Sequence, residues 1–167
     1  MRARIEKLVQ GILLRHWNGI LPVDVMFIAE KRGCRVRLIE GLSYNGEVCR
    51  VDGGYEIRCK ADDHEVRRRF TIAHELGHVE LGHLNGREKC LRDTRESYVI
   101  GTDKLIEREA NHFAAALLMP AQAVRAVVAE MRNPNIERMA RLFKVSRIAM
   151  GIRLKQLGII PNWVPLD

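Results

Sequence analysis

The sequence lacks the long apolar runs that mark membrane or secreted proteins. In its 167 residues, no apolar stretch approaches the roughly 20 residues that cross a bilayer. The basic N-terminal segment contains only the short apolar run Ile12, Leu13 and Leu14, which Arg15 ends, and no small-residue cleavage site follows. These features argue against a signal peptide. We therefore expect a cytoplasmic protein with no membrane partner.

Cysteine is scarce, and its spacing matches no common metal or redox motif. The four cysteines are Cys34, Cys49, Cys59 and Cys90, and no two of them form a C-x-x-C pair. Without a signal peptide, nothing places them in an oxidising compartment, where disulfides form and persist. The sequence therefore predicts four reduced, partly buried thiols.

The composition is that of one globular protein with an excess of positive charge. Hydrophobic residues make up 47% and charged residues 29% of the chain, and its length suffices for one substantial core. The net charge of +7 permits attraction to nucleic acid or to an acidic protein partner. The densest basic cluster, residues 67–69, also fits the solvated face of a helix. We therefore expect any contact with nucleic acid to be indirect.

Apolar periodicity predicts helices on both sides of a small sheet. Helical spacing is seen in most of the chain, whereas polar and apolar residues alternate only between residues 34 and 59. The expected helices cover residues 3–17, 22–33, 62–82, 103–119, 121–131 and, as two short helices, 136–157; the expected strands cover 35–39, 48–51 and 55–59. Pro22 is expected to open the second helix, and Asp62 or Asp63 to cap the third. Residues 85–101 are predicted to form a loop. The pattern predicts a mostly helical α+β fold with a three-stranded antiparallel sheet.

The segment His74-Glu75-Leu76-Gly77-His78 lies in a predicted helix and has the spacing of a metal site. Residues four apart on a helix share one face, with Cβ atoms about 6 Å apart, so His74 and His78 can bind one ion. Glu75 can then take a proton from a water molecule held by that ion. The motif predicts a Zn²⁺ hydrolase in which Glu75 is the catalytic base.

A catalytic zinc ion takes three protein ligands and one open position, so a third ligand is expected elsewhere. His83 is the nearest imidazole, but a helix would turn it well away from His78. Glu107 is favoured because it shares a helical face with Asn111 and with small residues that allow close approach. Asn111 could then accept a hydrogen bond from a ligating histidine. Glu109 is the competing ligand, about 200° round the helix from Glu107.

At these two motifs the chain resembles a known family. The run from Arg69 to His78, and the run from Glu107 to Pro120 (Glu-Arg-Glu-Ala-Asn-His-Phe-Ala-Ala-Ala-Leu-Leu-Met-Pro), closely resemble the ImmA/IrrE metallopeptidases in residue type and spacing. The resemblance covers most of the chain. It implies a zincin-like fold, with His74, His78 and Glu107 as zinc ligands and Glu75 as catalytic base. It also implies site-specific cleavage of helix-turn-helix repressors of phages, mobile elements or stress responses.

The same resemblance suggests how the chain is divided. Residues 1–132 would form the zincin-like metallopeptidase core, and residues 133–167 a C-terminal, helix-turn-helix-like subdomain packed on it. Some family members carry an additional N-terminal DNA-binding domain, whereas this chain starts at the family's core. We therefore expect a separately encoded repressor as the substrate.

Three points stay open at the level of sequence. The residue that stabilises the oxyanion in peptide hydrolysis could be His112, Tyr98 or Tyr44. Residues 136–157 have the rhythm and the basic residues of a DNA-binding helix-turn-helix, which would suit a DNA-binding regulator. A protein that inactivates its repressor by binding without cutting, as part of a toxin–antitoxin pair or otherwise, is the other alternative.

Overall fold

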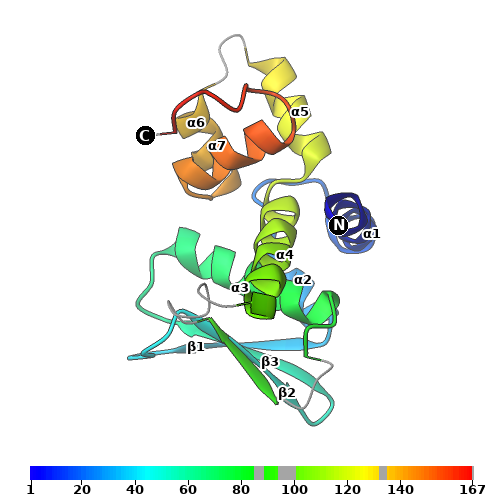
Figure 1. Cartoon of the computed structure of the whole chain (residues 1–167), viewed down its shortest axis with the longest axis vertical. Helices are drawn as coiled ribbons and strands as arrows, with labels where there is room; N and C mark the ends of the chain where they lie inside the picture. Colours follow the sequence, from blue (N-terminus) through cyan, green and yellow to red (C-terminus); the bar gives the residue numbers. More distant parts are fainter. Residues whose placement is uncertain (85–88, 94–100, 132–134, 167) are drawn as a thin grey trace.

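The computed structural model describes residues 1–84, 89–93, 101–131 and 135–166, and these form an α+β fold (Figure 1). The helices are α1 (Arg2–His16), α2 (Val25–Lys31), α3 (Glu65–Glu80), α4 (Gly101–Leu118), α5 (Ala121–Glu130), α6 (Ile136–Phe143) and α7 (Arg147–Gln156). The strands are β1 (Cys34–Ile39), β2 (Gly46–Val51), β3 (Gly54–Lys60) and β4 (Cys90–Asp93). The predicted fold class is confirmed.

The sheet differs from the predicted three-stranded antiparallel meander. Its strand order is β1-β3-β2-β4. β2 pairs antiparallel with both β3 and β4, but β1 pairs parallel with β3, so the all-antiparallel prediction is wrong. The alternating pattern located the strands correctly but does not fix which strand lies beside which. β4 was missed because only four residues form it, inside a segment without periodicity.

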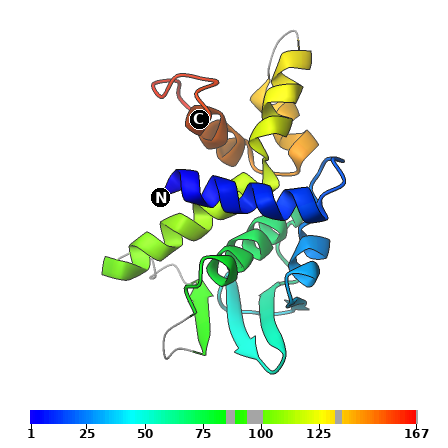
Figure 2. The same ribbon diagram turned by 90° about the vertical axis from the view of Figure 1, so that its right-hand side faces the viewer.

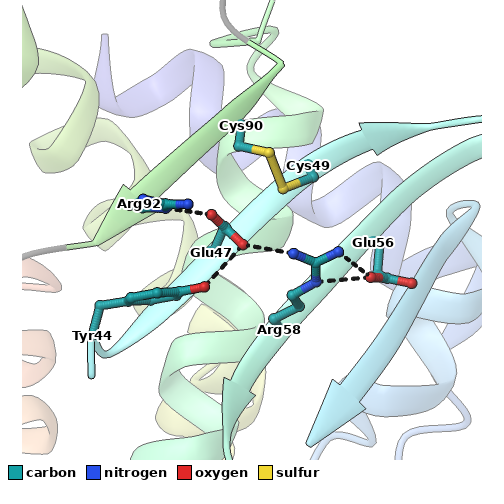
Figure 3. Close-up of a disulfide and its surroundings, with 7 residues drawn as sticks. All are labelled: Tyr44, Glu47, Cys49, Glu56, Arg58, Cys90 and Arg92. Carbon is teal, nitrogen blue, oxygen red and sulfur yellow. Dashed lines mark hydrogen bonds and ion pairs between the residues drawn. A yellow bond between two sulfur atoms is a disulfide. The ribbon is translucent and has the colours of Figure 1, made fainter. Parts of the chain in front are cut away.

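The prediction of four reduced cysteines is also wrong. Cys49 and Cys90 form a disulfide between β2 and β4, where the register places them directly opposite each other (Figure 3). The pairing could not be foreseen because β4 was not predicted. Cys34 and Cys59 are free and buried, and burial raises the pKa of their thiols to about 12 and about 11.

Helices α3 and α4 pack against each other on one face of the sheet, and α1 crosses α4 on the side away from the sheet (Figures 1 and 2). Gly77 of α3 permits the close approach. A Cβ atom at this position would lie 3.1 Å from a ring carbon of Phe113 and 3.2 Å from the Cα of Ala110, both on α4. The predicted contact through small residues is therefore confirmed, and it brings the two candidate ligand helices together.

Two helix starts differ from the predictions. Helix α2 begins at Val25 because the Asp24 side chain accepts a hydrogen bond from the Phe27 amide at 3.0 Å, three residues beyond Pro22. Helix α3 is capped by His64, which accepts from the Val66 amide at 3.3 Å, and not by an aspartate. Neither change moves the face of α3 that carries the histidine motif.

Helices α5, α6 and α7 lie beyond the end of α4, away from the sheet (Figure 1). Arg153 of α7 connects these helices to the rest of the fold. Its side chain is 1% exposed, and its guanidinium donates to the Met119 carbonyl at 3.0 Å and pairs with Glu6 of α1 at 2.5 Å. The predicted boundary between residues 132 and 133 lies outside the described residues. No single described helix has the length and hydropathy of a membrane span, but the bent pair Lys104–Leu118 and Ala121–Glu130, at 47°, passes that test together.

Candidate metal centre

Three buried side chains converge between α3 and α4. The Nε2 atoms of His74 and His78 are 3.0 Å apart. The Glu107 carboxylate reaches across from α4, with Oε2 3.1 Å from the His74 Nε2 and Oε1 3.4 Å from the His78 Nε2. The structure thus brings together the two histidines of the motif and the glutamate predicted to join them.

The donor atoms of this cluster fit a divalent metal ion. Zinc ligands at 2.0–2.2 Å in tetrahedral geometry lie about 3.4 Å from one another, close to the spacings found here. Glu107 Oε2 is buried and accepts no hydrogen bond from another described residue. Burial raises the pKa of Glu107, but the imidazoles of His74 and His78 next to its two oxygens lower it to about 2, so the group carries a negative charge. An anion facing two imidazoles suits a bound cation.

Asn111 orients the first histidine. Its Oδ1 lies 3.1 Å from the His74 Nδ1. An amide oxygen can only accept a hydrogen bond, so Nδ1 carries the proton and Nε2 presents its lone pair to the cluster. Asn111 therefore occupies the supporting position that the four-residue spacing from Glu107 predicts.

His83 and Glu109 orient the second histidine, His78, and the sequence did not predict this contact. Helix α3 ends at Glu80, and the chain then turns through Gly82 (φ +76°), which returns the His83 Nδ1 to within 2.9 Å of the His78 Nδ1. The His83 Nε2 in turn lies 3.2 Å from Glu109 Oε2. Extending the helix through residue 83 was the error, because it pointed this imidazole away. A glycine four residues after the motif was the available signal.

This chain of contacts has one consistent assignment of protons. If His83 Nε2 donates to the Glu109 carboxylate, its Nδ1 accepts from the His78 Nδ1–H. The His78 Nε2 is then left with a lone pair toward the cluster, as in His74. Burial lowers the pKa of His78 and of His83, which favours the neutral imidazole that ligates metals. Glu109, the competing third ligand, lies against His83 instead.

Glu75 lies beside the cluster, and strand β2 comes very close to it. The glutamate is 1% exposed. A Cβ atom at Gly46, the first residue of β2, would lie 2.7 Å from Glu75 Oε1 and would also collide with the methyl group of Thr71. The sequence indicates only a turn at Gly46, so its contact with Glu75, the candidate base, was not predicted.

The candidate oxyanion donors are dispersed. His112 faces α1, where its Nε2 lies 3.3 Å from Glu6 Oε1. The Tyr44 hydroxyl donates to Glu47 Oε2 at 3.0 Å (Figure 3). Tyr98 lies outside the described residues. The structure does not bring His112 and Tyr44 together.

A second group of ligand-type side chains, Glu47, Cys49 and Cys90, lies in the sheet. Its two sulfur atoms are bonded to each other. The buried Glu47 carboxylate is 2.5 Å from Arg92 and 3.0 Å from Arg58 (Figure 3). Burial raises the pKa of Glu47, but hydrogen bonds from Arg92 and Tyr44 bring it below its usual value. With the disulfide formed, the sulfur atoms are bonded to each other and the Glu47 carboxylate is paired with arginines of the same chain.

Comparison with known proteins agrees with this geometry. The family Peptidase_M78, described as the IrrE N-terminal-like domain, matches residues 29–155. The chain belongs to this metallopeptidase family. The resemblance to the ImmA/IrrE proteins is thereby confirmed, and the cluster of His74, His78 and Glu107 is a group that could bind the family's metal ion.

One solved structure also resembles this M78 family member. It is described as a Mycobacterium tuberculosis transcriptional regulator and matches with a TM-score of 0.62 at 19% sequence identity. The match covers 92% of this chain but 46% of that one, so this chain spans less than half the length of its structural relative. At this identity the likeness shows the fold alone. A comparison with curated proteins found no match.

Proposed function

We propose that this chain is a zinc-dependent endopeptidase in which Glu75 is the catalytic base. The observation that carries the proposal is the convergence of the His74, His78 and Glu107 donor atoms within 3.4 Å of one another, on a helix that also carries the buried Glu75 directly after His74. Two neutral imidazoles, one carboxylate and an open fourth position are typical of catalytic zinc sites. Membership of a metallopeptidase family supports the same chemistry.

The zinc ion and the residues of the chain would contribute different parts of the reaction. A zinc ion held by the three ligands would lower the pKa of a water molecule toward about 7 and polarise the peptide carbonyl. Glu75 would take a proton from the attacking water and later deliver it to the leaving amine. The close packing of Gly46 limits the conformations open to Glu75. Asn111 and the pair His83–Glu109 keep the two ligating imidazoles in the required tautomer.

We further propose a helix-turn-helix repressor as the substrate. The family resemblance supports this choice, and the structural relative described as a transcriptional regulator is compatible with it. Cleavage of a DNA-bound repressor would place the reaction in the cytoplasm. Any contact with DNA would then come through the repressor.

The outward face of α7 argues against the DNA-binding alternative. In a helix-turn-helix this helix would be the one that reads DNA, with basic or polar side chains exposed. Here Ile148 and Ile152 are 60% and 44% exposed, Arg153 is buried against Glu6, and the exposed Arg147 donates to the Leu166 carbonyl at 2.9 Å. A face of this kind suits protein or peptide contacts better than a phosphate backbone.

The test is cleavage of a repressor encoded beside this gene. Zinc-loaded wild-type protein should cut it at one site, as seen by intact-mass measurement, while Glu75→Gln, with zinc still bound, should cut at least 100 times more slowly. Equal cleavage by the two proteins would remove Glu75 from the mechanism. Recovery of the uncut repressor in a stable complex with the zinc-loaded wild type would favour inactivation by binding.

A further inference from the structure

Two adjoining cavities, together called the groove, lie near the metal centre. One, of about 470 Å³, lies between the start of α1, α4 and α7; the other, of about 440 Å³, lies between α3 and the turn before α7. They share the lining residues Phe70, Ser146 and Ala149, so they adjoin each other. Asn111, which bonds the ligand His74, lines the first cavity, and Thr71, one turn before Glu75, lines the second. The groove therefore lies next to the parts of α3 and α4 that carry the candidate site, although His74, Glu75, His78 and Glu107 do not themselves line it.

The floor and one wall of the groove are apolar. Phe70 of α3 and Ala115 of α4 contribute to the floor, and Ile148 and Ile152 of α7 line the wall while remaining partly exposed. Exposed aliphatic side chains next to a buried polar centre are typical of ligand sites, in which apolar contacts give affinity and a few polar groups give orientation.

The arginine, lysine, aspartate or glutamate side chains that line the groove are all of one sign, although Glu6 and Asp63 lie behind the lining residues His112 and Arg67. Arg2, Arg67 and Arg108 line the two cavities, and no aspartate or glutamate is among the described residues that do so. Arg67 forms an ion pair with Asp63 at 3.3 Å, whereas Arg2 and Arg108 form no ion pair with another described residue. These two guanidinium groups, on α1 and α4, flank the same apolar cavity. Complementarity then favours an anionic partner.

We propose that this groove binds an extended acidic peptide segment with one large aliphatic side chain. The aliphatic side chain fills the cavity between α4 and α7, and the flanking carboxylates pair with Arg2 and Arg108. The inference rests on the proposed peptidase function, because it assigns the substrate segment of the same site. It also gives α7 a role: this helix forms a wall of the substrate groove.

Peptide binding to a catalytically silent protein tests the groove. The protein is the full chain with Glu75→Gln and zinc, and the probe is a fluorescein-labelled peptide with one leucine between glutamates in an alanine–glycine sequence. By fluorescence anisotropy, this peptide should bind at least about tenfold more tightly than the same peptide with lysines for glutamates or serine for leucine. Equal affinity for all three peptides, or binding of none of them, would overturn the proposal.

Matched substitutions locate the binding. Ile152→Glu and Arg2→Glu, added singly, should each weaken binding of the acidic leucine peptide by about tenfold. Leu14→Glu and Arg15→Glu change the same residue types on the exposed surface of α1, outside the two cavities, and should leave it unchanged. Thermal unfolding of each variant controls for folding. Unaltered peptide binding by both groove variants would contradict the proposal. So would groove variants that lose binding of a fluorescein-labelled DNA duplex but keep binding of the acidic leucine peptide.

Cleavage of a proteome-derived peptide library separates this proposal from the peptidase function. If the zinc-loaded wild type cuts the library, but the Ile152→Glu variant cuts it with the same preference for acidic leucine sequences, the groove assignment is wrong and the peptidase proposal stands. If acidic leucine peptides bind as expected but neither they nor the repressor is cut, the groove stands and the peptidase proposal fails.

Discussion

Two buried glutamates show how the surroundings of a carboxylate separate a structural role from a functional one. Glu47 on β2 is surrounded by donors: Arg92 at 2.5 Å, Arg58 at 3.0 Å and the Tyr44 hydroxyl at 3.0 Å (Figure 3). Glu107 on α4 faces two imidazoles instead, and one of its oxygens accepts no hydrogen bond from another described residue. The first carboxylate is neutralised by its own chain, and the second would be satisfied by a cation.

The neighbours of these carboxylates reinforce the difference. The imidazoles next to Glu107 have their Nδ1 atoms engaged by Asn111 and His83, so their remaining nitrogens point toward the same space. The sulfur atoms next to Glu47 are engaged with each other. Both groups contain ligand-type residues, but in the sheet group two of the three ligand atoms are joined in a disulfide, whereas the group between α3 and α4 consists of two imidazoles and a carboxylate. Substitutions in the two groups should therefore affect different properties.

The largest expected effect is the loss of metal binding in Glu107→Ala. Removing one of three ligands should lower zinc affinity by more than the roughly 100-fold that loss of a supporting residue causes. Competition with a chromophoric chelator measures it. Glu47→Ala is the matched control and should keep wild-type affinity. Equal losses in the two variants would break the distinction between the two carboxylates.

Removal of the disulfide should give the largest effect on stability. A cross-link between residues 41 apart stabilises the fold by up to about 4 kcal/mol, so Cys49→Ser with Cys90→Ser should lose much of this in urea unfolding. Zinc affinity should not change. Cys34→Ser controls for loss of a buried thiol. Under denaturing conditions, the wild type purified without reductant should show two reactive thiols, and four after reduction. Four thiols before reduction would contradict the pairing.

Glu47→Gln should destabilise the protein by about 2 kcal/mol, because it weakens hydrogen bonds to two arginines that are themselves partly exposed. The pKa of Glu47 is lowered, so its stabilisation is complete above the usual value of 4.5 and is lost as pH falls through the lowered pKa. Urea unfolding should therefore show wild type and variant converging on acidification. A gap that stays constant with pH would contradict a role for the charge.

The smallest effect on zinc affinity is expected for Glu109 and His83, the residues that orient His78. Glu109→Gln removes the charge that holds His83, and His83→Phe removes the acceptor for the His78 Nδ1–H. Each should lower zinc affinity by about tenfold with little change in the stability of the metal-free protein. His16→Phe, on α1, controls for loss of an imidazole elsewhere. If both variants bind zinc as tightly as wild type, His83 does not orient His78.

The chemistry of the candidate site was more predictable than its surroundings. His74 and His78, and likewise Glu107 and Asn111, are each four residues apart on one helix, so helical geometry alone fixes which residues share a face. The small residues Gly77 and Ala110 indicate where the two helices meet. The ligand cluster and a contact from Asn111 to a ligating histidine could therefore be anticipated.

Features that depend on contacts between distant segments could not be predicted. The pairing of β4 with β2 joins residues some 40 positions apart, and no alternating pattern marks β4. The disulfide follows from that pairing, and the parallel β1–β3 pair and the approach of Gly46 to Glu75 depend on other contacts between separate segments. His83 was misplaced for a local reason, because the helix was extended past the turn at Gly82.

The zinc X-ray absorption spectrum of the loaded wild-type protein tests the central claim most directly. It separates the two candidate groups, because zinc–nitrogen and zinc–oxygen distances of about 2.0–2.2 Å differ from the zinc–sulfur distance of about 2.3 Å. A site made by His74, His78 and Glu107 should show only nitrogen and oxygen neighbours, with the outer scattering of two imidazole rings. A sulfur neighbour, or the absence of imidazole scattering, would contradict it.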